Sequence, residues 1–192
     1  MKKRIAIFAS GSGSNAQKIM EHFKRNDEAE VVLVLTNNPQ AYVLQRADNF
    51  EIPAHIFTRH EFYETDEVIR ILKTLQVDLI VLAGFLWLVP LTLLKSFPNK
   101  IINLHPALLP KYGGKGMYGD HVHQAILANK EEESGITIHF VNEQFDEGEI
   151  IHQSKFKIEP GDTLEMVKFK GQQLEHQHFP KVIESLLKKM KS

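Results

Sequence analysis

The chain has no cysteine, a formal net charge of only −1 and no N-terminal leader pattern. Without cysteine it forms no disulfide and uses no thiolate chemistry. The near-neutral charge gives no electrostatic reason to expect nucleic acid or an acidic membrane surface as a partner. The apolar segment after the basic N-terminus is five residues long, too short for a signal peptide. We therefore expect a cytoplasmic protein that acts on small molecules.

Histidine is plentiful, but its distribution does not favour a metal. The ten histidines are scattered. No pair has the His-Glu-x-x-His spacing of a zinc helix. We expect no metal cofactor.

The 192 residues, 43% of them apolar, are enough for one well-buried domain, expected over residues 1–192. Apolar segments of strand length alternate with segments of helical period, which predicts a Rossmann-like α/β fold. The mostly parallel, twisted sheet has about seven strands and helices on both faces. The predicted strands are residues 4–9, 30–35, 54–57, 78–83, 101–104, 135–141 and 150–158. The predicted helices are residues 14–25, 41–49, 61–75, 91–97, 121–128 and 163–189.

Three details of this pattern are specific enough to be checked. The first five strands are apolar throughout, so we expect both of their faces to be buried. Residues 136–141 alternate between apolar and polar, which favours an antiparallel pairing with the next strand. Asp162 is a natural cap for the last helix, and Pro180 should kink or split that helix.

A glycine-rich turn lies between the first strand and the first helix. Its sequence, Gly11-Ser12-Gly13-Ser14-Asn15-Ala16, fits the G-x-G-x-x-G/A pattern, in which backbone N–H groups at a helix N-terminus bind phosphate. A dinucleotide site also needs an acidic residue at the end of the second strand, which here reads Leu35-Thr36-Asn37-Asn38. We therefore expect a phosphorylated substrate rather than NAD(P). A tight turn without a ligand is the alternative.

Two polar side chains lie at the end of the apolar strand at residues 101–104, where apolar residues would be expected. Asn103 and His105 are two residues apart and so point to the same face, and Pro106 ends the strand. Open α/β sheets bind ligands at this end of their strands. An amide beside an imidazole suits acyl-type transfer, in which a carbonyl oxygen gains charge while a proton moves. Asp146, in the turn-like Phe145-Asp146-Glu147-Gly148, would complete the set; taken singly, each residue has an ordinary structural explanation.

Several segments together carry a resemblance to a known family. They are Gly11-Ser12-Gly13-Ser14-Asn15, Leu82-Ala83-Gly84-Phe85, Ile102-Asn103-Leu104-His105-Pro106-Ala107-Leu108-Leu109-Pro110, Gly135-Ile136-Thr137-Ile138-His139 and Phe145-Asp146-Glu147-Gly148. Along essentially the whole chain, the sequence resembles the glycinamide ribonucleotide transformylases. The Asn-x-His-Pro segment with the later Asp marks the wider formyltransferase superfamily, and the glycine loop narrows the resemblance to the purine enzymes.

The resemblance implies a formyltransferase fold and an activity. A formyl group would pass from 10-formyltetrahydrofolate, the co-substrate, to the amine of phosphoribosylglycinamide in purine biosynthesis. Asn103 and protonated His105 would donate to the oxyanion, while Asp146 would orient His105 and favour its charged form. The residues that the resemblance implies would bind the phosphoribosyl substrate are Gly13, Ser14, Asn15 and Glu175. Those that it implies would bind the folate are Arg59, Leu86, Trp87, Leu88, Val89 and Asn103.

Two departures from the family pattern limit this carry-over. Residues 111–120 form a longer and more glycine-rich link than usual, so its ligand contacts are not transferred. Trp87 stands where many relatives have a basic or smaller residue, which predicts either altered pterin packing or plain core packing. Whether His121, His123 and His139 line the same cleft or are structural is open.

Three other functions share parts of this pattern. A formyltetrahydrofolate hydrolase would use the same three residues but usually carries an extra N-terminal domain. A methionyl-tRNA formyltransferase would need a basic C-terminal domain for RNA. A non-catalytic nucleotide-binding module would keep the glycine loop without using Asn103 and His105. We expect the transferase, as a monomer or weak homodimer.

Overall fold

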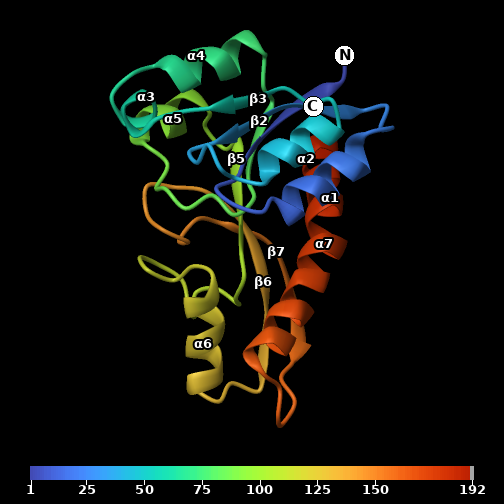
Figure 1. The fold of residues 1–192 in the computed structure, drawn as a ribbon, viewed down its shortest axis with the longest axis vertical. Coiled ribbons are helices and arrows are strands. Elements are labelled where there is room, and N and C mark those ends of the chain that lie inside the picture. Colours follow the sequence, from blue (N-terminus) through green and yellow to red (C-terminus); the bar gives the residue numbers. More distant parts are fainter. Residues whose placement is uncertain (191–192) are drawn as a thin grey trace.

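The computed structural model describes residues 1–190 and is built around a seven-stranded sheet in the order β3-β2-β1-β4-β5-β6-β7 (Figure 1). The strands are β1 Lys3–Phe8, β2 Ala29–Thr36, β3 Ala54–Ile56, β4 Leu79–Leu82, β5 Ile101–His105, β6 Glu133–Phe140 and β7 Ile150–Lys157. The five strands from β3 to β5 in this order are parallel, whereas β6 is antiparallel to both β5 and β7. The predicted mostly parallel α/β sheet and the antiparallel pairing of its last two strands are confirmed.

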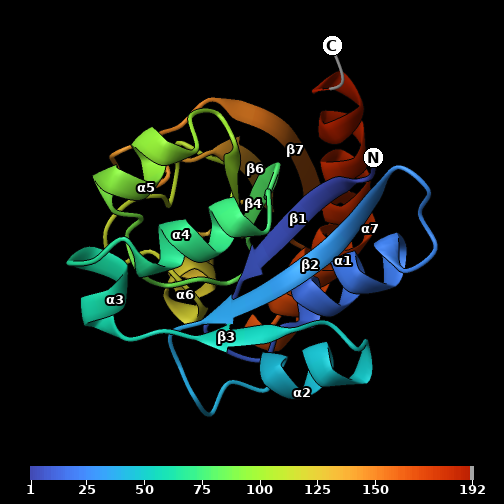
Figure 2. The ribbon, with the colours of Figure 1, turned by 90° about the horizontal axis from the view of Figure 1, so that it is seen from above.

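Helices cover both faces of the sheet because parallel strands bury both of their faces. The helices are α1 Ser14–Phe23, α2 Val43–Asn49, α3 Arg59–Tyr63, α4 Glu67–Thr74, α5 Leu91–Ser96, α6 Asp120–Ala128 and α7 Leu164–Lys189. Seen from above, α1, α2 and α7 lie on one side of the sheet and α3, α4 and α5 on the other (Figure 2). Each group encloses its own apolar cluster against the strands. None of the helices in residues 1–190 is both long and apolar enough to cross a membrane.

Two local predictions are wrong. β3 is not doubly buried, because it forms the edge of the sheet and leaves Ala54 and Ile56 exposed. The helix predicted over residues 61–75 is two helices, α3 and α4. The Thr65 hydroxyl donates to the Glu61 carbonyl and accepts from the Glu67 N–H, a local pattern that competes with a continuous helix.

The last helix is capped by a different residue from the one predicted, and it is not split. Thr163, not Asp162, caps α7 by accepting from the Met166 N–H. Asp162 binds Lys170 and the Glu159 N–H instead. Pro180 does not split the helix, which runs for 26 residues. Pro180 is buried there, and packing of this part of α7 on the sheet offsets the backbone hydrogen bond that a proline lacks.

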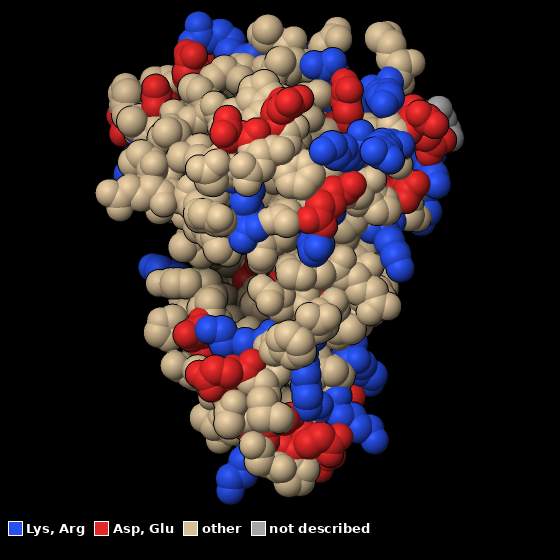
Figure 3. Space-filling model, turned by 45° about the vertical axis from the view of Figure 1, so that its right-hand side comes forward, with Lys and Arg blue, Asp and Glu red and all other residues tan. Residues whose placement is uncertain are grey.

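Charge is distributed without a dominant sign on the face drawn in Figure 3. Lysine and arginine side chains alternate with aspartate and glutamate, as the net charge of −1 leads one to expect. The same face is hollowed at mid-height.

Candidate active site

A cavity of about 460 Å³ opens at the carboxyl ends of the central strands. Segments that follow β1, β4 and β5 line it, together with the loop between β6 and β7 and part of α7. In open α/β sheets, this end of the strands is where ligands bind. Ser10 joins two of the segments, because its N–H donates to the Gly84 carbonyl and its hydroxyl accepts from the Leu86 N–H.

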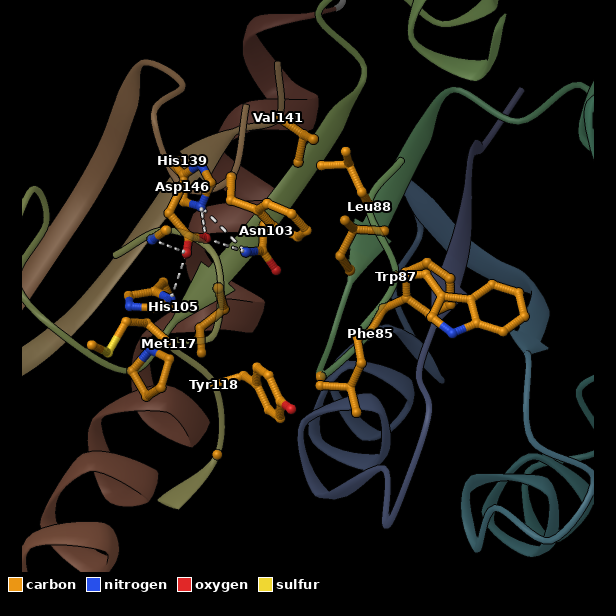
Figure 4. Close-up of a pocket in the computed structure, with 18 of the residues that line it drawn as sticks. Phe85, Trp87, Leu88, Asn103, His105, Met117, Tyr118, His139, Val141 and Asp146 are labelled. Atoms are coloured by element: carbon orange, nitrogen blue, oxygen red, sulfur yellow. Dashed lines mark hydrogen bonds and ion pairs between the residues drawn. The ribbon is translucent and has the colours of Figure 1, made fainter. Parts of the chain in front are cut away.

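The strand β5 delivers two polar side chains to this cavity. Ile102 and Leu104 are buried, and Asn103 and His105 alternate with them. In the ladder with β6, Asn103 lies opposite His139 and His105 opposite Thr137. The two-residue spacing therefore places the side chains of Asn103 and His105 in the wall of the cavity, as Figure 4 shows.

The loop between β6 and β7 brings Asp146 to the same place. Asp146 has a φ of 57°, a left-handed conformation that aspartate tolerates better than most residues. Two residues on, a Cβ on Gly148 would lie 1.7 Å from the Phe140 carbonyl oxygen, so only glycine fits. Asp146 Oδ2 lies 3.3 Å from His105 Nδ1, and Asp146 Oδ1 accepts from Asn103 Nδ2 at 3.4 Å. The three residues singled out in the sequence are thus brought together.

His139 is a fourth member of this cluster. Its Nδ1 lies 2.8 Å from the Phe140 carbonyl oxygen, which can only accept, so this nitrogen carries the proton. Its Nε2 lies 3.2 Å from Asn103 Nδ2. With Nδ2 directed at both His139 and Asp146, the oxygen of the Asn103 amide faces the cavity (Figure 4). The role of Asn103 as a donor to an oxyanion stays a prediction.

His105 is held between two acceptors. Its Nδ1 faces Asp146, and its Nε2 lies 2.7 Å from the Tyr112 carbonyl oxygen. Burial lowers the pKa of His105, and the Asp146 charge and the Tyr112 carbonyl raise it by less. Asp146 thus favours the charged form of His105, as expected, but the net pKa is lowered because the residue is only 3% exposed and desolvation dominates.

Asp146 stays ionised in spite of its position. Burial alone would raise its pKa, but the neighbouring His139 and His105 rings and the Gly114 N–H lower the pKa on balance. The Gly114 N–H donates to Asp146 Oδ2 at 3.1 Å. A carboxylate beside His105 stabilises the imidazolium form during proton transfer.

The glycine loop lies at the other end of the cavity. Gly13 has a φ of 70° and is the N-cap of α1, and a Cβ there would clash with Val43. Asn15 Nδ2 donates to Glu175 Oε2 at 2.6 Å, and both residues line the cavity. Burial raises the pKa of Glu175, and the bond from Asn15 opposes this shift. Gly13 and Ser14 lie beside Asn15 but outside the cavity wall.

Arg46 is a residue that the sequence reasoning missed. It lies on α2, stacks over the Tyr42 ring and donates from Nε to the Ser12 carbonyl at 2.7 Å. A guanidinium is therefore fixed beside the glycine loop. The only signal in the sequence was its place in an amphipathic helix, which does not distinguish it from a solvated charge.

Most of the residues predicted to contact folate line the cavity. Leu86, Trp87, Leu88 and Val89 all line it. Trp87 also packs against the rings of Phe57, Phe62 and Phe85, as the core-packing interpretation predicts, and its contact with a pterin stays a prediction. Arg59 does not line the cavity and instead stacks over Tyr63 and Trp87 at its edge.

Residues 111–120, whose contacts the sequence left open, close one side of the cavity from Gly114 to Asp120. Of the two remaining histidines, His123 is 7% exposed and lines the cavity. His121 is exposed and contacts the Tyr118 ring.

Comparisons with known proteins place this arrangement in a family. A family model described as formyl transferase matches residues 3–183. The phosphoribosylglycinamide formyltransferase of Bacillus subtilis is 40% identical over 190 residues, 96% of this chain and 95% of that protein. The chloroplastic phosphoribosylglycinamide formyltransferase of Arabidopsis thaliana is 38% identical over 96% of this chain, which spans 65% of that relative's length.

Comparison with solved structures indicates the same family. The crystal structure of phosphoribosylglycinamide formyltransferase from Bacillus halodurans superposes with a TM-score of 0.88, at 38% identity, over 98% of this chain and 97% of that one. The resemblance read from the sequence motifs is confirmed. Since the family match runs through nearly every strand and helix described above, the chain belongs to the formyl transferase family.

Proposed function

We propose that this protein transfers a formyl group from 10-formyltetrahydrofolate to the amine of phosphoribosylglycinamide, in purine biosynthesis. One observation carries the proposal: in a single cavity, the Asp146 carboxylate lies within 3.4 Å of polar atoms of both Asn103 and His105. That cavity reaches the glycine loop through Asn15 and an apolar wall through residues 86–89. Both substrates can therefore reach the same reacting atoms.

The formyl acceptor, phosphoribosylglycinamide, suits the end of the cavity next to the glycine loop. The first N–H groups of α1 have no partner within the helix and favour a phosphate. The Arg46 guanidinium, fixed on the Ser12 carbonyl, adds a positive charge at this loop. Asn15 and Glu175 come next along the cavity and offer hydrogen bonds to the ribose or the amine. We therefore assign Gly13, Ser14, Asn15, Glu175 and Arg46 to the acceptor.

The co-substrate, 10-formyltetrahydrofolate, suits the apolar end of the cavity at residues 86–89. Leu86, Trp87, Leu88 and Val89 give a surface for the flat pterin, with Asn103 at its inner end. Arg59, stacked on Trp87, offers a charge at the outer edge. We assign these residues to the folate.

The transfer step follows from the arrangement of the polar groups. The amine nitrogen of the acceptor attacks the formyl carbon, and the Asn103 oxygen that faces the cavity accepts an N–H of this amine. His105 protonates the oxyanion of the tetrahedral adduct, and Asp146 stabilises the imidazolium before that step. A lowered pKa makes this imidazolium a stronger acid than a free one. The bond from carbon to folate N10 then breaks and N10 takes up the proton that the amine loses, while the hydroxyl proton returns to His105 as the formyl C=O reforms.

One experiment separates this activity from its alternatives. Purified protein is mixed with 10-formyltetrahydrofolate, with and without phosphoribosylglycinamide, and the cofactor absorbance is followed. Loss that depends on the amine means a transferase, whereas loss without the amine means a hydrolase. Binding of both compounds with no turnover would favour the nucleotide-binding module. The cytoplasmic location, the absence of nucleic-acid partners and the monomeric or weakly dimeric state remain predictions.

A further inference from the structure

The backbone of Tyr112 orients the ring of His105. The Tyr112 carbonyl oxygen lies 2.7 Å from His105 Nε2, and a carbonyl only accepts, so Nε2 carries a proton. The other nitrogen, Nδ1, faces Asp146. Because Nε2 keeps its proton on the Tyr112 carbonyl, the proton that the reaction moves must be the one on Nδ1. The Tyr112 carbonyl therefore determines which ring nitrogen exchanges its proton.

The same short segment also holds Asp146. The Gly114 N–H donates to Asp146 Oδ2 at 3.1 Å, and this is the oxygen nearest His105. A Cβ on Gly113 would lie 3.2 Å from Asp146 Cβ, so Gly113 also lies close to the Asp146 side chain. Residues 112–114 thus contact both members of the His105 and Asp146 pair through backbone atoms alone.

Outside the cavity, Glu131 fixes this segment from the other side. It lies between the end of α6 and the start of β6. Glu131 Oε1 accepts from the Tyr112 hydroxyl at 2.9 Å, and its two oxygens accept from Lys111 Nζ at 3.0 and 3.1 Å. The Tyr112 ring also packs against the apolar cluster of Ala107 and α6. The bonds from Lys111 and Tyr112 lower the pKa of Glu131, which keeps it an acceptor.

We propose that Glu131 is a positioning residue for the reaction: by binding Lys111 and the Tyr112 hydroxyl, it sets the backbone that orients His105 and Asp146. The proposal rests on the proposed function for its kinetic consequences, but its structural consequence can be measured without turnover. Glu131 touches no substrate, since it lies outside the cavity wall.

Two mild variants test the proposal by kinetics. Glu131→Gln removes the charge, and Tyr112→Phe removes only the hydroxyl. A misplacement of catalytic groups by about 1 Å can cost about 10²-fold in rate. The shift expected from either variant is smaller, so each should lower kcat about tenfold. The KM values of both substrates should change by less than about twofold, because binding groups are untouched. The double variant should lose less than the product of the two single losses, since both act through the same segment.

The matched control is Glu133→Gln. Glu133 lies two residues further along, at the start of β6, and pairs with Lys155 in an exposed ion pair. It makes the same kind of contact without touching residues 111–114. Its kcat should equal that of the unaltered protein.

A second measurement reads the His105 ring directly. In protein labelled with ¹⁵N-histidine, ring-nitrogen shifts report the tautomer and the titration midpoint, and His105→Gln assigns the signal. Because the Tyr112 carbonyl raises the pKa of His105, loosening it should move the midpoint to lower pH in Glu131→Gln and Tyr112→Phe. The midpoint should not move in Glu133→Gln.

Three results would overturn the proposal: an unchanged His105 midpoint in both variants, a rise in KM with unchanged kcat, or an equal kcat loss in the control. If the unaltered protein transfers no formyl group, the proposed function fails. The titration arm would then still decide whether Glu131 positions His105.

Discussion

Asp146 Oδ2 lies 3.3 Å from His105 Nδ1, although 41 positions of sequence and the whole of α6 and β6 separate the two residues. The contact joins a strand end to a loop in a left-handed conformation. It gives the imidazole a charged neighbour inside a desolvated site, where such a neighbour has the most effect on proton transfer.

Asp146→Asn should lower kcat by about 10²- to 10⁴-fold, the usual contribution of general acid–base catalysis. Asp146 raises the pKa of His105 against the larger effect of burial, so its loss lowers that pKa further. Less imidazolium is then present at neutral pH, and the decline of kcat with rising pH should begin at a lower pH. Circular dichroism checks that the variant is folded. Near-normal turnover in a folded variant would remove Asp146 from the mechanism.

Asn103→Ala should cost more in kcat than in substrate affinity. Its amide nitrogen bridges Asp146 and His139, and its oxygen faces the cavity, so truncation removes a contact to the reacting amine and loosens the carboxylate. We expect a fall in kcat of about 10²-fold. Asn103→Asp is the companion variant, because it keeps the oxygen and replaces the donor. A large rise in KM with kcat preserved would make Asn103 a binding residue instead.

The parts of the site that follow from local sequence could be predicted. Asn103 and His105 share a face because a strand repeats every two residues, and Pro106 marks the strand end. The glycine loop is also local, since Gly13 needs a positive φ at the start of α1. Strand positions were found within a few residues for the same reason.

The parts that depend on distant contacts could not be predicted. His139 joins the cluster through the register between β5 and β6, which no local pattern gives. Arg46 reaches Ser12 across 34 residues. The net pKa shift of His105 needed its burial, which competes with the Asp146 charge and wins.

Arg46→Gln should raise the KM for phosphoribosylglycinamide by about 10- to 100-fold, the usual value of a hydrogen bond to a charged group. Arg46→Lys should raise it less, because the charge stays while the bond from Nε to Ser12 is lost. The KM for the folate co-substrate should not change. The matched control is Arg70→Gln on α4, on the opposite face of the sheet. An acceptor analogue without the phosphate should react equally with all variants, and an equal loss with that analogue would contradict the assignment.

Tyr63→Phe should weaken binding of the folate and leave the acceptor unaffected. The Tyr63 hydroxyl donates to the Leu88 carbonyl at 2.9 Å and so holds residues 86–89 in place. Burial raises the pKa of this hydroxyl, which keeps it a donor over the working pH range. The neighbouring Trp87 is the chain's one tryptophan, so its fluorescence reports on this wall alone.

Fluorescence titration therefore measures the effect without catalysis. Folate should quench Trp87, and its Kd should rise about fivefold to tenfold in Tyr63→Phe, the cost of one lost hydrogen bond. Tyr42→Phe is the control, because Tyr42 lies on α2's side of the molecule, away from Trp87, and stacks on Arg46. Since the phenylalanine keeps the ring that packs on Trp87, a loss of affinity can be attributed to the hydroxyl. Quenching by the acceptor alone, or an unchanged Kd in Tyr63→Phe, would contradict the assignment of this wall to the folate.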